Sequence, residues 1–152
     1  MPYNIDKQTK ISDTDPSAGS VNKSQVKDLK ILIAEDDEGS QDLFAIVLEQ
    51  LVKEIITAET GLDAVEKCRT NPDLDLILMD IRLPEMDGYE ATRRIRQFNK
   101  DIIIIAQTAF GLTGDREKAI EAGCNDYISK PFTKEELFAL VDKNLIKDRD
   151  NH

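Results

Sequence analysis

Two kinds of segment alternate along the chain after about residue 28. Short, almost continuously apolar runs such as Leu76–Met79 are typical of strands buried on both faces of a parallel sheet. Between these runs lie segments whose apolar residues recur every three or four positions, which predicts amphipathic helices. Strands are predicted over residues 29–34, 54–58, 75–79, 101–107 and 126–129, and helices over 40–52, 62–68, 89–98, 115–122 and from 133 onward.

Local signals support two of the helix ends. Gly123 follows the helix over 115–122, where a glycine commonly ends a helix. Thr133 and Glu136 have the spacing of a capping box, which predicts the start of the last helix. Apolar residues at helical spacing predict the buried faces of the first and last helices: Leu43, Phe44, Val47, Leu48 and Leu51 in the first, and Leu137, Leu140, Val141 and Leu145 in the last.

Five strands that alternate with five helices predict an α/β fold. The fold is a single, doubly wound, five-stranded parallel sheet with helices on both faces. This domain is expected over residues 28–147. Residues 1–27 are polar and lack apolar periodicity, so they are interpreted as a linker or disordered tail, and residues 148–152 as a C-terminal tail.

Composition narrows the classes of function. Asp and Glu total 30 against 20 Lys and Arg, for a formal charge of −10. This charge argues against binding to nucleic acid, although most of the acidic surplus is interpreted as solvated surface. No apolar run has a membrane-spanning length, and the N-terminus has no secretory signal pattern. We therefore expect a cytoplasmic domain without direct membrane contact.

Cysteine and histidine usage excludes two kinds of site. Cys68 and Cys124 lie far apart, outside any CxxC pattern, and are interpreted as reduced, buried thiols. His152 is the only histidine and the last residue. Neither a zinc site nor histidine-based catalysis is therefore expected.

Charged residues gather where the predicted strands end. Glu35, Asp36 and Asp37 follow the first strand, and Asp80 ends the third. Asp80 either caps the next turn or has a partner that needs its charge. Ligands of open α/β sheets bind at the carboxyl ends of the strands, which favours the second reading.

The fourth and fifth strands bring complementary groups to the same edge. Thr108 and Ala109 follow the fourth strand, and Lys130 and Pro131 follow the fifth. Clustered carboxylates need a cation, and Mg²⁺ with the Lys130 ammonium would meet that need. Such a set suits phosphoryl transfer, with Asp80 as the nucleophile.

Four motifs in this order resemble the receiver domain of two-component signalling, the response-regulator family. They are ILIAEDDE (31–38), LILMDIRLPEMDGYEATRRIR (76–96), IIAQTAF (104–110) and DYISKPF (126–132). The resemblance covers residues 28–147 and implies the flavodoxin-like strand order 2-1-3-4-5.

The resemblance also implies roles for individual residues. Asp80 would accept the phosphoryl group. Mg²⁺ would be held by Asp36, by Glu35 mainly through water, by Asp80 and by the Arg82 carbonyl. The remaining implied roles are phosphate binding and switching by Thr108, Ala109, Lys130 and Tyr127, a cis peptide bond before Pro131, and tuning of the phosphate lifetime by Arg82 and Phe110. The three consecutive acids leave the register open by one residue, so Asp37 stays an alternative ligand.

The partners implied by the resemblance are proteins of a phosphorelay. A histidine kinase or a histidine phosphotransfer protein would donate the phosphoryl group, and a downstream relay or output protein would respond. Homodimerisation would use the face of the fourth helix, fifth strand and fifth helix. The start of the chain, Pro2-Tyr3-Asn4 and a polar linker, is similar to the junction between kinase and receiver in hybrid sensor histidine kinases.

Three other functions compete with this interpretation. A phosphatase of the haloacid-dehalogenase type would carry a DxD pattern after the first strand, where this chain has adjacent acids. A flavodoxin-like cofactor binder would need a phosphate loop there, and three acids would repel a phosphate. A degenerate receiver that only binds partners is disfavoured because the set of acids, Thr108 and Lys130 is complete. Like a receiver, such a module would turn over no outside substrate.

Overall fold

A computed structural model describes residues 29–49, 52–109 and 114–150, with side chains described through Leu145. The predicted tail over 1–27, and also Leu51 and Phe110, lie outside the described residues. The elements in chain order are β1 (Leu29–Ala34), α2 (Glu38–Glu49), β2 (Val52–Ala58), α3 (Gly61–Thr70), β3 (Leu76–Asp80), α4 (Gly88–Arg96), β4 (Ile103–Thr108), α5 (Asp115–Ala122), β5 (Asp126–Ser129) and α6 (Lys134–Asp150).

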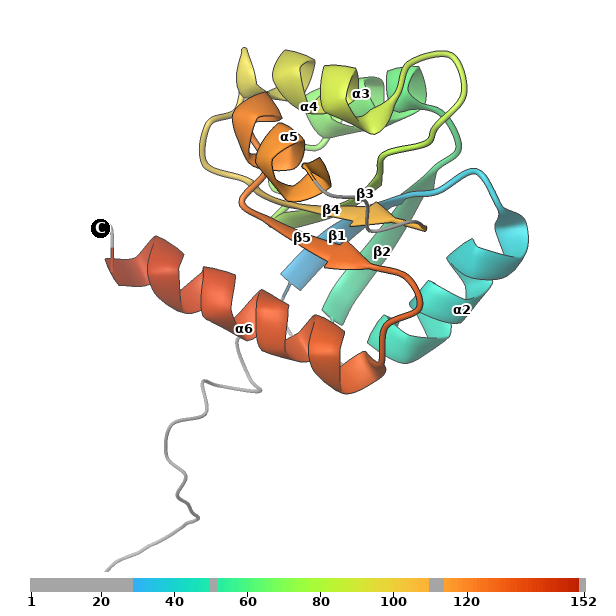
Figure 1. The fold of residues 1–152 in the computed structure, drawn as a ribbon, viewed down its shortest axis with the longest axis vertical. Coiled ribbons are helices and arrows are strands. Elements are labelled where there is room, and N and C mark those ends of the chain that lie inside the picture. Colours follow the sequence, from blue (N-terminus) through green and yellow to red (C-terminus); the bar gives the residue numbers. More distant parts are fainter. Residues whose placement is uncertain (1–28, 50–51, 110–113, 151–152) are drawn as a thin grey trace, which may run out of the picture.

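The five strands form one parallel sheet in the order β2-β1-β3-β4-β5, which confirms the predicted fold. Helices α3, α4 and α5 cover one face of the sheet, and α2 and α6 cover the other (Figure 1). None of the described helices is long and apolar enough to cross a bilayer.

Each face of the sheet has its own apolar core. Alternate residues of the central strands divide between the two cores, as the pleat of a strand requires. The core under α3, α4 and α5 contains both cysteines, and burial raises the pKa of each thiol to about 11, so both stay protonated. The core under α2 and α6 contains Phe44, Leu48, Leu137 and Val141.

Several predicted boundaries shift by one to three residues, and one apolar residue of the predicted helical pattern is exposed. Helix α2 begins at Glu38 because the Asp37 carboxylate accepts a hydrogen bond from the Ser40 N–H at 2.8 Å. Leu43 is 58% exposed, since the buried face of α2 runs through Gln41, Phe44 and Leu48 instead. The α6 helix continues to Asp150, past the predicted domain end at 147.

The predicted capping box of α6 is confirmed. The Thr133 N–H donates to the Glu136 carboxylate at 2.8 Å, and the Glu136 N–H donates to the Thr133 hydroxyl at 3.0 Å. Gly123 lies after α5 with φ +118°, a left-handed conformation that favours glycine. Both helix ends could be predicted from the sequence because each signal depends only on neighbours within a few residues.

Candidate functional site

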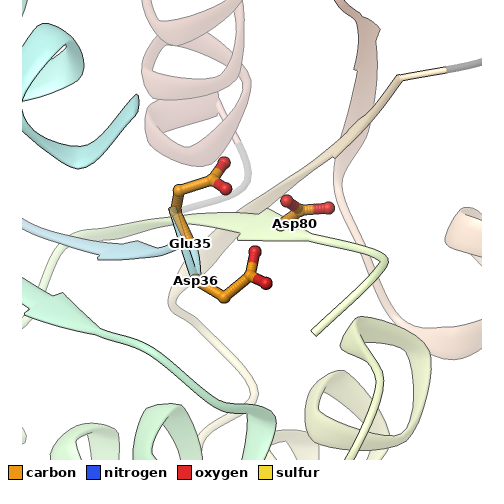
Figure 2. Close-up of side chains that lie close together, drawn as sticks. All are labelled: Glu35, Asp36 and Asp80. Carbon is orange, nitrogen blue, oxygen red and sulfur yellow. The ribbon is translucent and has the colours of Figure 1, made fainter. Parts of the chain in front are cut away.

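Three carboxylates meet at the carboxyl edge of the sheet. Strands β1 and β3 are neighbours, so Glu35 and Asp36, which follow β1, face Asp80 at the end of β3. One oxygen from each carboxylate lies within 4.8 Å of the others. Figure 2 shows the three side chains converging on one point. The structure thus brings together the three acids that the sequence singled out.

The backbone holds Asp80 in a fixed orientation. All five residues of β3 are buried, and Asp80 itself is 6% exposed. The Arg82 N–H donates to Asp80 Oδ1 at 2.9 Å, which leaves Oδ2 toward Lys130. Gly88 starts α4 so close to this turn that a Cβ would lie 2.3 Å from the Asp80 carbonyl oxygen. Only glycine allows this approach of helix to strand end.

Lys130 is the cation of the cluster. Its Nζ lies 2.9 Å from Glu35 Oε1 and 3.5 Å from Asp80 Oδ2. Burial raises the pKa of the Glu35 carboxyl, and the charge of Asp80 adds to this while Lys130 opposes it. Burial alone would lower the pKa of Lys130, but Glu35 and Asp80 together raise it. The ammonium is therefore charged at neutral pH.

The end of β5 is anchored to the end of β4. The Lys130 N–H donates to the Thr108 carbonyl at 2.7 Å, and the Lys130–Pro131 peptide bond is cis, as the sequence implied. The backbone of Lys130 therefore lies two strands away from Asp80. The lysine side chain extends across β4 to approach the carboxylates.

Asp37 takes a different role from its two neighbours. Its carboxylate caps α2 through Ser40, and the hydrogen bonds that it accepts from Ser40 lower its pKa. Among the described residues, the acidic group that could hold a metal ion consists of Glu35, Asp36 and Asp80. Asp37, the alternative ligand, is therefore found at the cap of the helix that follows, outside this group of three carboxylates.

The candidate switch residues lie on β4, directly after β4, and on the neighbouring strand β5. Thr108 is buried at the last position of β4 and pairs with Ser129 of β5. The Tyr127 hydroxyl lies 3.4 Å from the Ser129 hydroxyl, with the ring half-buried against the core under α3, α4 and α5. Ala109 follows Thr108 and is exposed. Ser129 therefore connects Thr108, its strand partner, with Tyr127, its hydroxyl contact.

Two buried polar residues of the strands were given no role by the sequence interpretation. Gln107 is fully buried in β4 beside Asp80, and Asp126 is buried at the start of β5. Gln107 interrupts the apolar run Ile103–Ala106, a signal that could have identified it. Asp126 had no such signal, because its partners come from helices distant in sequence.

The donor set fits Mg²⁺. Mg²⁺ prefers oxygen ligands, commonly takes one or two carboxylates and keeps several waters. The described cluster offers only carboxylate oxygens, two of them from buried side chains, beside an open edge formed by the exposed Asp36. Zinc and copper favour imidazole and thiolate ligands, which this edge lacks among the described residues.

The profile of the response regulator receiver domain family matches residues 31–142 of this chain. The chain belongs to this family. The polar-differentiation response regulator DivK of Brucella ovis is 40% identical over 105 residues, 68% of this chain and 85% of DivK. The histidine-protein kinase BarA of Escherichia coli is 35% identical over 115 residues, which are 74% of this chain but only 12% of BarA.

Solved receiver domains have the same fold. The receiver of the sensor histidine kinase PA1611 from Pseudomonas aeruginosa is 39% identical, with a TM-score of 0.69 over 76% of this chain and 95% of that one, and its active-site cleft coordinates magnesium. The Ssk1 receiver of Saccharomyces cerevisiae, crystallised with the histidine phosphotransfer protein Ypd1, is 32% identical, with a TM-score of 0.68 over 74% and 85% of the two chains.

Family membership establishes the general activity. Receiver domains accept a phosphoryl group on an aspartate in a Mg²⁺-dependent reaction within two-component signalling and phosphorelays. They act as signalling phosphoacceptors, not as enzymes that turn over an outside substrate. As a family they interact with kinases and with histidine phosphotransfer proteins.

Proposed function

We propose that Asp80 is the phosphoryl acceptor of this receiver. One observation carries the proposal: the Lys130 ammonium pairs with Asp80 and Glu35 together, at the buried end of β3. An Asp80 carboxylate oxygen would bond to the phosphorus of a phosphohistidine protein as the bond from phosphorus to the imidazole nitrogen breaks. The Arg82 N–H orients the carboxylate for this attack.

Phosphoryl transfer requires positioning and charge neutralisation more than covalent help from the protein. Lys130 supplies a fixed positive charge beside the acceptor, and Thr108 with the Ala109 backbone N–H would bind a phosphoryl oxygen. Glu35, Asp36, Asp80 and the Arg82 carbonyl would hold Mg²⁺, which neutralises phosphoryl charge when bound. Glu35 also keeps the lysine in place through the 2.9 Å contact.

The proposed switch connects the site to the face formed by α5, β5 and α6. Movement of Thr108 toward the phosphoryl group would free space beside Ser129 and Tyr127, and the tyrosine would turn inward. The adjacency that supports this is the pairing of Thr108 with Ser129 and the Tyr127–Ser129 hydroxyl contact. This face would carry the signal to a downstream partner and could be shared by a homodimer.

The donor is proposed to be a histidine kinase or a histidine phosphotransfer protein. Two large apolar side chains support a docking face on α2: Leu43 and Ile46 lie one turn apart and are 58% and 66% exposed. Because α2 begins two residues after Asp36, a helix seated there would lie near the carboxylates. The domain over 28–147 would act in the cytoplasm, either alone or as part of a hybrid kinase.

The test measures intact protein mass after incubation with acetyl phosphate. Wild type should gain one phosphoryl group only when Mg²⁺ is present, and Asp80→Asn should gain none. Asp37→Asn is the matched control, because asparagine also caps helices and Asp37 lies outside the cluster. Uptake by Asp80→Asn equal to that of wild type would overturn the assignment.

A further inference from the structure

The Gln107 side chain has an unusual environment. Within the described residues its amide is fully buried, yet neither its oxygen nor its nitrogen has a hydrogen-bond partner. Leaving a buried amide without partners costs free energy, so each such group needs an explanation. The preceding residues Ile103, Ile104 and Ile105 show that this strand readily accommodates apolar side chains.

Register and alternation place Gln107 beside Asp80. The two residues are paired across β3 and β4. Ile103 and Ile105 belong to the core under α2 and α6, as do Leu76 and Leu78. Since side chains alternate along a strand, Gln107 and Asp80 continue these two rows on the same face, at the same edge of the sheet.

The Lys130 side chain crosses the sheet at this point. Lys130 follows β5, and its ammonium contacts Asp80 on β3 and Glu35 after β1. Strand β4 lies between β5 and β3, and Gln107 is its last residue on that face. The lysine therefore passes over the position of Gln107 on its way to the carboxylates.

An amide suits this place chemically. Its oxygen can accept from an ammonium, and its nitrogen can donate to a carboxylate or a phosphoryl oxygen. An ammonium has three N–H donors, and two of them account for the contacts with Glu35 and Asp80. Rotation about the Gln107 side-chain bonds is the movement by which the amide would turn toward these neighbours, from a strand position paired with Asp80.

We propose that Gln107 is a positioning residue of the acceptor site, acting through Lys130. Its amide oxygen accepts from the Lys130 ammonium as the lysine turns from Glu35 toward the phosphoryl group on Asp80. Its amide nitrogen donates to the same acidic cluster. This inference rests on the proposed function, because it takes Asp80 as the acceptor. In the unphosphorylated protein the Gln107 amide lacks hydrogen-bond partners, which costs free energy. In the phosphorylated protein its new hydrogen bonds offset that cost.

The experiment uses the full chain and compares wild type with Gln107→Met and Gln107→Asn. Methionine matches the size of glutamine but cannot make the hydrogen bonds, so it should raise the midpoint of thermal unfolding. It should also lower the maximal rate of phosphorylation by acetyl phosphate, at saturating Mg²⁺, by about threefold to tenfold, as expected for one hydrogen bond. The concentration for half-maximal rate should change little, and Gln107→Asn should keep more of the rate.

Thr92→Val is the matched control. Thr92 is also fully buried and polar, but it lies on α4 on the other face of the sheet, where its hydroxyl contacts Cys124. This substitution should leave the phosphorylation rate unchanged. A stability gain in Gln107→Met with a wild-type rate would overturn the positioning role and leave Gln107 as a packing residue. Failure of wild type to accept a phosphoryl group would overturn the proposed function as well.

Discussion

Asp80 and Asp126 are both buried aspartates in this sheet, but their surroundings differ. Asp126, at the start of β5, is 2% exposed and accepts from the Tyr127 N–H at 2.9 Å and the Asn144 amide at 3.2 Å. Arg116 and Lys143 each lie 3.3 Å from its oxygens. Asp80 has one backbone donor, a longer contact with Lys130, and two further carboxylates beside it.

The difference separates a structural carboxylate, Asp126, from the proposed phosphoryl acceptor, Asp80. Burial alone would raise the pKa of Asp126, but Tyr127, Asn144 and Lys143 together bring it below its ordinary value. Together with Arg116, these partners join α5, β5 and α6. Around Asp80, three carboxylates of the described residues lie together, and the Lys130 ammonium pairs with two of them, so the cluster keeps an affinity for further positive charge. An excess of negative charge at a rigid strand end is what a metal-assisted phosphoacceptor needs.

The largest predicted effect distinguishes Lys130, which lies beside Asp80, from Lys143, which lies beside Asp126. Lys130→Met removes the positive charge beside the proposed acceptor, and we expect the rate of phosphorylation by acetyl phosphate to fall about 100-fold, as for other groups that stabilise developing charge. Lys143→Met removes the matching lysine at Asp126 and should leave this rate unchanged. The time course of phosphoryl uptake, followed by intact mass, measures both. Equal slowing in the two variants would contradict the division of roles.

Removing the structural aspartate should affect stability instead of chemistry. Asp126→Ala removes the carboxylate that accepts from the Tyr127 N–H and from the Asn144 amide, which keeps only its hydrogen bond to the Leu140 carbonyl, so we expect a loss of about 2 kcal/mol in the free energy of unfolding. Urea denaturation at pH 7 measures it. Asp80→Asn should cost nothing or stabilise the protein, because it relieves repulsion with Glu35 and Asp36. The comparison would be wrong if Asp80→Asn destabilised the fold as much as Asp126→Ala.

The smallest predicted effect is the change with pH in the contribution of Asp126 to the free energy of unfolding. The pKa of Asp126 is lower in the folded protein than the value of about 3.9 expected in the unfolded chain. Its contribution is therefore complete above the unfolded pKa and is lost as pH falls through the folded pKa, because the unfolded chain takes up the proton first. The stability difference between wild type and Asp126→Ala should be constant from pH 7 to about pH 5 and shrink below pH 4. A constant difference down to pH 3 would contradict this.

The sequence predicted most elements because their signals are local. The bounds of α5 and β5 match the prediction, and so do the capping box of Thr133 and the glycine after α5. Apolar runs located β3 and β4 to within one or two residues. Leu43 belongs to the apolar pattern of the first predicted helix, but its side chain is exposed. The spacing of apolar residues predicts a helix but does not define how wide its buried face is. That width is set by how α2 rests on the sheet.

By itself, the sequence determined the fold class, the strand ends that carry chemistry, and the types of residue gathered there. Alternation of apolar runs and helical periods requires a parallel sheet, and parallel strands bring their carboxyl ends to one edge. Only the tertiary structure decided that Asp36 faces Asp80, that the Lys130 side chain reaches Asp80 and Glu35, and that Gln107 pairs with Asp80. These contacts join residues up to 95 positions apart, so they depend on strand order and register, which no local pattern encodes.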